Sequence, residues 1–216
     1  MVAQVSGVPT DITTAPLRTV RPVMLEHIYA NPRKELRRMR DNGTVVQIAP
    51  GTYTAKPDTI PAELAWQPGL EDAAMAYATA QYGDRVPILY GIGAARFHHA
   101  IPRAIGATVI AVPEQHRRVE LIGGGRIVFT TTDPKKLAAR YERGPLGGYL
   151  VTTPEQTLLD LLDRPTLGDM PAAANEAIKA LTMSVDQELA RKLAGRRARI
   201  LQERLGRLLN MGAVDE

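Results

Sequence analysis

A proline-rich segment in the first third of the sequence limits how the chain can fold. The segment AKPDTIPAELAWQPG, residues 55–69, contains three prolines and a glycine. Prolines at this density interrupt both helices and sheet ladders, because proline lacks a backbone N–H and fixes φ. A chain of 216 residues, 44% of them hydrophobic, can still fill two cores. We therefore expect an N-terminal domain over residues 1–56, a linker over residues 57–69 and a second domain over residues 70–216.

The composition excludes several classes of chemistry. The sequence has no cysteine, which rules out disulfides, thiolate metal sites and thiol nucleophiles. No segment approaches the roughly 18 uncharged apolar residues of a membrane span, and the first residues lack a basic stretch followed by an apolar run. We expect a soluble, cytoplasmic protein with no membrane partner.

The basic charge is concentrated at the two ends of the chain. Residues 1–60 carry 8 Lys and Arg against 5 Asp and Glu, residues 61–190 carry 12 against 15, and residues 191–216 carry 7 against 3. The net charges are therefore +3, −3 and +4. A basic end module beside an acidic middle favours an anionic partner such as nucleic acid.

The segment NPRKELRRMRDNG, residues 31–43, predicts a short helix. Asn31 can accept hydrogen bonds from the first free amides, and Pro32 suits the first helical position. Gly43 is typical of a helix end. A preceding helix over residues 22–30 would place four apolar side chains in a small core: Val23, Met24, Ile28 and Tyr29.

This second helix carries a strongly basic surface. At about 100° per residue, Leu36 and Met39 share a narrow apolar stripe. Glu35 is the only acid in the helix body, so the remaining charges repel one another. A phosphate backbone would offset that repulsion, and arginine also binds guanine edges. The cations are Arg33, Lys34, Arg37, Arg38 and Arg40.

After the basic helix, a hairpin is expected across the turn APGT, with Val46 and Ile48 opposite Tyr53. Helix, turn, basic helix and hairpin in this order predict a winged helix-turn-helix, whose second helix enters the major groove of DNA. In this interpretation Arg33, Lys34 and Arg37 face base edges. The phosphate contacts would come from Arg38, Arg40, Gln47 and Thr52. The alternative is a solvated basic face, or one that binds RNA.

The second domain is expected to be α+β, with a small mixed sheet backed by a helical C-terminal half. The glycines at 123–125 turn a hairpin, and Thr153 with Gln156 has the spacing of a capping box before a leucine-rich helix. Strands are expected at residues 86–90, 107–112, 118–122, 126–131 and 149–152. Further helices are expected near residues 171–182, 186–194 and 196–210.

No motif in the second domain specifies catalysis, a metal or a cofactor. His98 and His99 are adjacent and point about 100° apart on a helix, so packing or a hydrogen bond near the sheet is the simpler explanation for His98. The segment GIGAAR has Arg96 where a dinucleotide-binding loop has its third glycine. Asp160 and Asp163 lie opposite the leucines of their helix and are expected to be exposed. We expect no enzyme activity, no metal site and no cofactor.

Four segments, in their order along the chain, resemble the AbiEi-type antitoxins. MRDNGTVVQIAPGTY, residues 39–53, is similar to the passage from the recognition helix into the wing. YGIGAARFHHAIP, residues 90–102, resembles the family's sheet-to-helix segment, and VTTPEQTLLDLLDRP, residues 151–165, resembles its signature. RLGRLLNMG, residues 204–212, fits its closing helix.

The resemblance implies a bacterial antitoxin that is also an autorepressor. Its N-terminal winged helix would bind inverted repeats upstream of its own operon, through residues 33–40 and the wing around Gly51. Its second domain would counteract a nucleotidyltransferase-like toxin encoded by a neighbouring gene. The family usually begins with an additional helix, whereas VSGVPTDITTAPLRTV, residues 5–20, contains two prolines. Residues 1–17 are therefore expected to form a shortened or displaced helix or an extended arm.

The C-terminal helix is expected to be amphipathic, with Leu201, Leu205, Leu208 and Leu209 on its apolar face. Its basic side is either a solvated face or a surface for an anion or the toxin, formed by Arg196, Arg199 and Arg207. The expected partners are double-stranded operator DNA, the toxin and a second copy bound to paired half-sites. The alternative function is a nonspecific RNA- or protein-binding module with a basic helix.

Overall fold

The chain has a mixed α+β fold, as expected. The structure is a computed structural model that describes residues 8–61 and 64–212. The helices are α1 (Thr10–Thr13), α2 (Pro32–Asp41), α3 (Leu70–Tyr82), α4 (Gly91–Phe97), α5 (Pro154–Asp163), α6 (Pro171–Thr182), α7 (Gln187–Ala194) and α8 (Arg199–Gly212), with 3-10 helices η1 (Pro16–Arg18), η2 (Pro22–Leu25) and η3 (Pro134–Lys136). The strands are β1 (Thr19–Val20), β2 (Val45–Ala49), β3 (Thr52–Ala55), β4 (Ile88–Tyr90), β5 (Ala107–Val112), β6 (Val119–Glu120), β7 (Arg126–Thr131), β8 (Ala139–Gly144) and β9 (Gly147–Thr152).

Residues 8–56, here called the N-terminal unit, form a small antiparallel sheet with strand order β1-β3-β2. Helix α2 packs on this sheet, and the expected hairpin between β2 and β3 is confirmed. The unit has its own hydrophobic core, which consists of Ile12, Val20, Leu25, Leu36, Met39, Val45, Tyr53 and Ala55.

The register of the hairpin differs from the expected one. Gln47 lies opposite Tyr53, and a bulge follows between Gln47 and Ala49. Side chains normally alternate between the two faces of a strand, and a bulge breaks that alternation. As a result Ile48 and Ala49 are both buried, while Val46 is only half-buried.

The expected helix over residues 22–30 is wrong. The chain forms the short 3-10 helix η2 and then turns. A 3-10 helix has three residues per turn, and η2 is only four residues long. It therefore buries a single side chain, that of Leu25. Val23 is 57% exposed, and Met24 and Ile28 are also exposed. Of the four expected core residues, Tyr29 packs partly against the core.

Residues 8–18 fold against the small sheet. The one-turn helix α1 buries Ile12, and η1 buries Leu17. Arg18 then binds Asp58 through two hydrogen bonds of 2.8 and 3.1 Å. Residues 8–17 therefore form short helical segments and not an extended arm, while residues 1–7 lie outside the described residues.

Residues 70–212, the C-terminal unit, contain a six-stranded mixed sheet of order β6-β7-β5-β4-β9-β8. The pairs β5–β7 and β4–β9 are parallel, and the others are antiparallel. Strand β8 was not expected, because its sequence ARYERG is charged and lacks an apolar alternation. Its position at the sheet edge, paired only with β9, explains why so polar a segment is tolerated.

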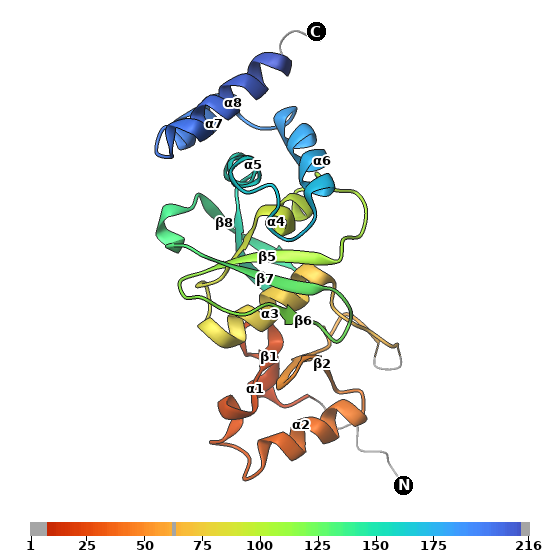
Figure 1. Cartoon of the computed structure of the whole chain (residues 1–216). Coiled ribbons are helices and arrows are strands. Elements are labelled where there is room, and N and C mark those ends of the chain that lie inside the picture. Colours follow the sequence, from red (N-terminus) through yellow and green to blue (C-terminus); the bar gives the residue numbers. More distant parts are fainter. Residues whose placement is uncertain (1–7, 62–63, 213–216) are drawn as a thin grey trace.

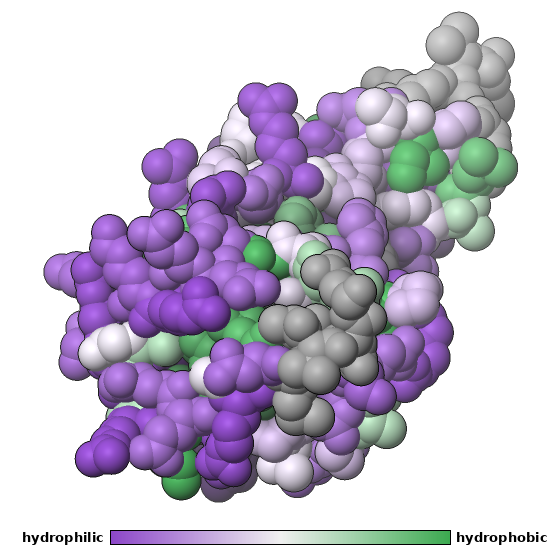
Figure 2. All heavy atoms as spheres, turned by 90° about the horizontal axis from the view of Figure 1, so that it is seen from above, coloured by the Kyte–Doolittle hydropathy of each residue, from purple (hydrophilic) through white to green (hydrophobic). Residues whose placement is uncertain are grey.

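The helices cover both faces of the larger sheet. In Figure 1, α3 lies between the two sheets, α4 and α5 lie on the opposite face, and α7 and α8 form the end farthest from α2. Figure 2 looks from the α7–α8 end and shows mainly hydrophilic side chains with small hydrophobic patches. No helix in the described part of the chain is long and apolar enough to cross a bilayer.

The two units share a hydrophobic cluster. Leu17, Ile48 and Ala49 of the N-terminal unit pack in the same cluster as the buried face of α3. The backbone N–H of Ile122, in the β6–β7 turn, also donates to the carbonyl of Ile48 at 2.9 Å. These contacts hold the sheet under α2 against the C-terminal unit.

Candidate nucleic-acid interface

Helix α2 begins and ends where the local sequence signals place it. The Asn31 side chain accepts a hydrogen bond from the backbone N–H of Lys34 at 3.1 Å, and Pro32 occupies the first helical position. At the other end Gly43 has φ +72°, and the N–H of Thr44 donates to the carbonyl of Met39. This geometry closes the last turn with the left-handed residue for which glycine is favoured.

One narrow stripe anchors α2 to the small sheet. Leu36 and Met39 are buried, as expected, among Leu25, Val45 and Tyr53. Burial of one such side chain contributes about 1.5–3 kcal/mol. Two anchors are enough to orient a helix of three turns, and they leave its other faces in solvent.

Three of the five cations on α2 have no side-chain partner among the described residues. Arg33, Lys34 and Arg37 are exposed, and their side chains form no ion pair or hydrogen bond with any other described residue. Arg38 instead pairs with Glu35 at 2.9 Å. The first two turns of α2 therefore present three cations that form no ion pair within residues 8–61 or 64–212.

A hollow of about 600 Å³ lies beside this end of α2. Arg33 and Arg37 line it from the helix, and Pro50 and Gly51 line it from the hairpin turn. Arg21 approaches from the segment before η2 and adds a third arginine, which the sequence analysis missed. The other polar residues of the lining are Glu26, Asn31, Tyr53 and Gln81. No spacing rule connects Arg21 to the others, because the fold of the small sheet brings them together.

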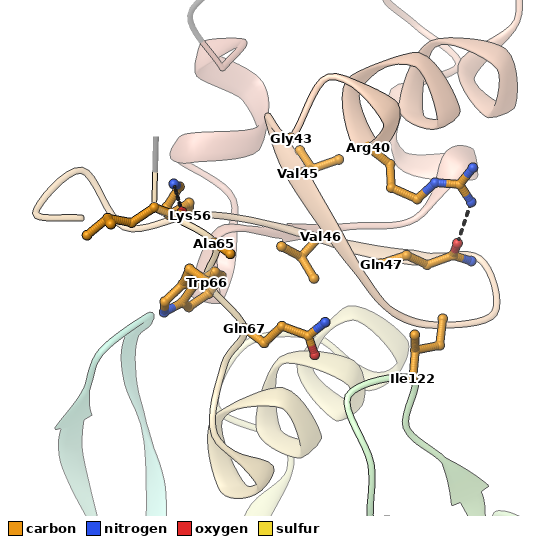
Figure 3. Close-up of a pocket in the computed structure, with 11 residues that line it drawn as sticks. Arg40, Gly43, Val45, Val46, Gln47, Lys56, Ala65, Trp66, Gln67 and Ile122 are labelled. Carbon is orange, nitrogen blue, oxygen red and sulfur yellow. Dashed lines mark hydrogen bonds between the residues drawn. The ribbon is translucent and has the colours of Figure 1, made fainter. Parts of the chain in front are cut away.

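The last turn of α2 faces a different hollow. Arg40 pairs with Asp41 at 2.8 Å, which raises the pKa of Arg40, and it donates to Gln47 Oε1 at 3.1 Å. Figure 3 shows Arg40 reaching from α2 to Gln47 above a groove of about 700 Å³, which Trp66 and Ile122 line from the other side. Arg40 and Gln47 thus lie between the two units, apart from the Arg33 end.

Thr52 cannot serve as the expected phosphate contact. It is only 1% exposed, because it lies on β3 with its side chain toward the protein interior. Its hydroxyl has no hydrogen-bond partner among the described residues. The hairpin residues that line the hollow beside Arg33 and Arg37 are Pro50, Gly51 and Tyr53, not Thr52.

The polar residues singled out near the larger sheet have local partners. His98 Nε2 lies 2.7 Å from the carbonyl oxygen of Thr152, which confirms the expected hydrogen bond near the sheet. Arg96 pairs with Glu71 at 3.0 Å. Burial raises the pKa of Glu71, although the adjacent guanidinium opposes that change. No group of three or more potential ligands capable of holding a metal occurs among the described residues.

Asp160 was expected to be exposed, and this expectation is wrong. It is 1% exposed, and its carboxylate accepts from Arg197 at 2.7 Å and from the Gln156 amide at 2.6 Å. Burial raises the pKa of Asp160 to about 7, while Arg197, Tyr90 and Gln156 oppose the increase. Helical periodicity did place Asp163 in solvent, but helices α7 and α8 cover the side of α5 that carries Asp160.

The first turn of α5 modifies the expected capping box. The Thr153 hydroxyl accepts from the N–H of Gln156 at 3.3 Å, as expected. The Gln156 side chain does not return to the helix start. Its Oε1 accepts from the N–H of Ala138 and its amide donates to Asp160, so that it links η3 to α5.

The three arginines of the expected basic surface near the C-terminus are all exposed. Arg199 is 91% exposed and pairs with Glu203 at 3.0 Å, and Arg207 lies further along α8. Arg196 precedes α8 and lines a cleft with Arg197 and two lysines of η3. The apolar face of α8 is confirmed, because Leu201, Leu205 and Leu209 are buried and Leu208 packs against them.

Comparisons with known proteins show the fold alone. The chain is similar to the crystal structure of the RV2827C protein from Mycobacterium tuberculosis, with a TM-score of 0.62 and 20% sequence identity. The match covers 90% of this chain and 72% of that chain. The sequence matches no family model and no curated protein.

Proposed function

We propose that the N-terminal unit binds operator DNA in the manner of a winged helix-turn-helix, with the short 3-10 helix η2 in place of the first helix. In this proposal α2 is the recognition helix and the β2–β3 hairpin is the wing. The observation that carries it is the set of three exposed cations on α2, Arg33, Lys34 and Arg37, which have no intramolecular partner among the described residues.

The electrostatics of α2 favour an anionic partner over a solvated face. Like charges three or four residues apart on a helix destabilise it, and Arg33 and Arg37 have that spacing. A solvated helix normally interleaves acids to avoid this cost. On α2 the acids Glu35 and Asp41 are taken up by Arg38 and Arg40, so the repulsion among the first two turns persists until phosphates bind.

The proposal also divides the contacts between bases and phosphates. Arg33, Lys34 and Arg37 project from the first turns of the helix, the part of a recognition helix that usually contacts base edges. Arg21 and the turn at Gly51 flank them and are suited to the phosphates on either side. Arg38 can also reach phosphate, because an ion pair between exposed side chains contributes little and is easily exchanged.

We further propose that the protein is an antitoxin and autorepressor that counteracts a nucleotidyltransferase-like toxin. The support is the order of the AbiEi-like segments from the basic helix to α8. Co-expression with the product of the neighbouring gene tests it. Relief of the growth arrest caused by that product is the expected result, and unrelieved arrest rejects the antitoxin proposal without affecting DNA binding.

Fluorescence anisotropy tests the DNA proposal. The full chain is titrated onto labelled DNA from upstream of its own gene and onto a shuffled copy at matched salt. We expect a preference of about a thousandfold or more for the native DNA. Equal affinity for the two would leave a nonspecific charge patch, and would reject an operator-binding repressor. Salt dependence alone does not decide, because any phosphate-binding surface shows it.

Paired half-sites are part of the same proposal. One short helix contacts only a few base pairs. DNA-binding proteins with a helix-turn-helix commonly gain specificity because two copies bind two half-sites. We expect cooperative binding and a footprint over both arms of an inverted repeat. Protection of a single half-site at saturating protein would contradict the paired arrangement.

A further inference from the structure

A second basic hollow lies in the C-terminal unit. It is a cleft of about 440 Å³ between η3 and the turn that joins α7 to α8. Lys135 and Lys136 line one wall, and Arg196 and Arg197 line the other. The remaining lining residues are Leu137, Ala138, Gln156 and Leu193, so no acidic residue lines the cleft.

The lysine wall is held by hydrogen bonds that its backbone forms with Asp133, Gln156 and Thr153. The Asp133 side chain accepts from the N–H of Lys135 at 3.0 Å and caps η3. The N–H of Ala138 donates to the buried side chain of Gln156, and the Ala138 carbonyl accepts from the N–H of Thr153 at 2.9 Å. Residues 133–138 are thereby attached to the start of α5.

The arginine wall is held by a buried ion pair. Arg197 Nη2 donates to Asp160 Oδ1 at 2.7 Å, and the Gln202 amide donates to the carbonyl of Arg197 at 2.9 Å. Asp160 also accepts from Gln156, whose other side-chain atom binds the lysine wall. Asp160 and Gln156 thus connect the two walls and set the width of the cleft.

The charges of the cleft do not cancel. Asp160 balances Arg197, but the side chains of Lys135, Lys136 and Arg196 form no ion pair with any described residue. The acids closest in sequence to the lining residues are Glu155, which is buried, and Asp133. Asp133 is exposed and does not line the cleft. Three uncompensated cations therefore converge on a concave site, which is the environment that polyanions prefer.

We propose that this cleft binds an oligophosphate chain, either free or as part of a nucleotide. Lysine supplies point charges and arginine supplies planar donor groups, and phosphate oxygens accept from both. Cations on two facing walls suit an anion with charges along its length better than a single phosphate. The volume lies within the range of roughly 300–1,000 Å³ typical of small-ligand sites.

This site is separate from the proposed DNA interface. In Figure 1, α7 and α8 lie at the end of the molecule opposite α2. The proposal therefore does not depend on DNA binding or on an antitoxin function, and it can be tested on the protein alone.

Isothermal titration calorimetry with inorganic tripolyphosphate is the test. The full chain is titrated with tripolyphosphate in buffer that contains EDTA and about 100 mM salt. At this ionic strength, interactions between charges more than about 10 Å apart are screened, so close contacts dominate the affinity. We expect saturable binding of one tripolyphosphate. The variant Lys136→Ala with Arg196→Ala should weaken it by about tenfold or more, because it removes one charge-assisted contact from each wall.

The matched control is Arg199→Ala. Arg199 lies three residues after Arg196 in the sequence, is exposed and pairs with Glu203 outside the cleft, so tripolyphosphate affinity should not change. A second control, Arg33→Ala with Arg37→Ala, should also bind tripolyphosphate normally. Because all five substituted positions are exposed, circular dichroism should show that each variant is folded.

Titration with ATP identifies the source of the phosphate chain. Affinity for ATP above that for tripolyphosphate indicates a nucleotide, and weaker affinity indicates the free chain. Absence of saturable binding by tripolyphosphate overturns the proposal. So does unchanged affinity in the cleft variant, or loss of binding in the α2 variant, which would place the anion at the DNA interface.

Discussion

Arg197 donates to the buried carboxylate of Asp160 at 2.7 Å, and this pair attaches the turn between α7 and α8 to helix α5. The carboxylate is buried, whereas about a third of the guanidinium is exposed. Burial raises the pKa of Asp160 to about 7 despite its partner. The pair therefore connects the C-terminal helices to the core and makes stability sensitive to pH.

Asp160→Asn should flatten the pH dependence of stability. A raised pKa means that folded Asp160 holds its proton more tightly than the unfolded chain does, so its contribution is largest below about pH 4 and is lost as the pH rises toward 7. In the wild type the free energy of unfolding should fall across this window with a slope of up to about 1.4 kcal/mol per pH unit from this group. Urea denaturation from pH 4 to 8 measures it.

The control for this prediction is Asp163→Asn, which changes an exposed carboxyl on the same helix. Because burial, not the charge of Asp163, is the main cause of the raised pKa of Asp160, most of the pH dependence should persist in this variant. If the Asp160→Asn curve is parallel to the wild-type curve, the group does not titrate as the burial of Asp160 requires.

Arg37→Ala should reduce affinity for the native upstream DNA by about 1–3 kcal/mol, with little effect on shuffled DNA. The physical reason is the loss of a donor that contacts a base edge. Arg38→Ala is the matched control on the next residue. Because Arg38 is paired with Glu35, its loss should be smaller and equal on both DNAs. Anisotropy titrations of both variants measure these affinities. An equal loss of affinity on both DNAs for Arg37→Ala would show that Arg37 does not contact a base edge.

Arg21→Ala should weaken binding to native and shuffled DNA alike. Arg21 lies beside Arg33, Arg37 and the turn at Gly51, where a phosphate contact is expected. Removal of one phosphate contact should reduce the salt slope of log affinity by about 1. Titrations at four salt concentrations measure the slope. A sequence-dependent loss with an unchanged slope would show that Arg21 contacts a base.

Thr52→Val should stabilise the protein by about 1 kcal/mol and leave DNA affinity unchanged. The buried hydroxyl of Thr52 has no partner among the described residues, so its desolvation is uncompensated, and valine has nearly the same shape. Urea denaturation and anisotropy are the two measurements.

Thr54→Val is the matched control on the same strand. The Thr54 hydroxyl lies 3.3 Å from the carbonyl oxygen of Arg18 and 3.4 Å from that of Leu17, so this substitution should destabilise the protein. Loss of stability in Thr52→Val, to the same extent as in Thr54→Val, would mean that the Thr52 hydroxyl has a partner after all.

Local signals in the sequence were enough to place most elements. Asn31, Pro32 and Gly43 mark the ends of α2, because a cap and a left-handed glycine act within one turn. Periodicity also placed the buried leucines of α8 and the expected helix over residues 171–182. Strand β8 was not predicted, because an edge strand pairs on one side only and needs no apolar alternation.

Tertiary structure alone decided which of these residues act together. The exposure of Asp160 could not be read from α5, because the side that faces away from the leucines is covered by helices from later in the chain. Arg21 joins Arg33 and Arg37, and Lys136 joins Arg196, across distances in sequence that no periodicity spans. A single sequence records what each segment prefers within a few residues of itself, whereas burial and charge clustering depend on which segments pack side by side.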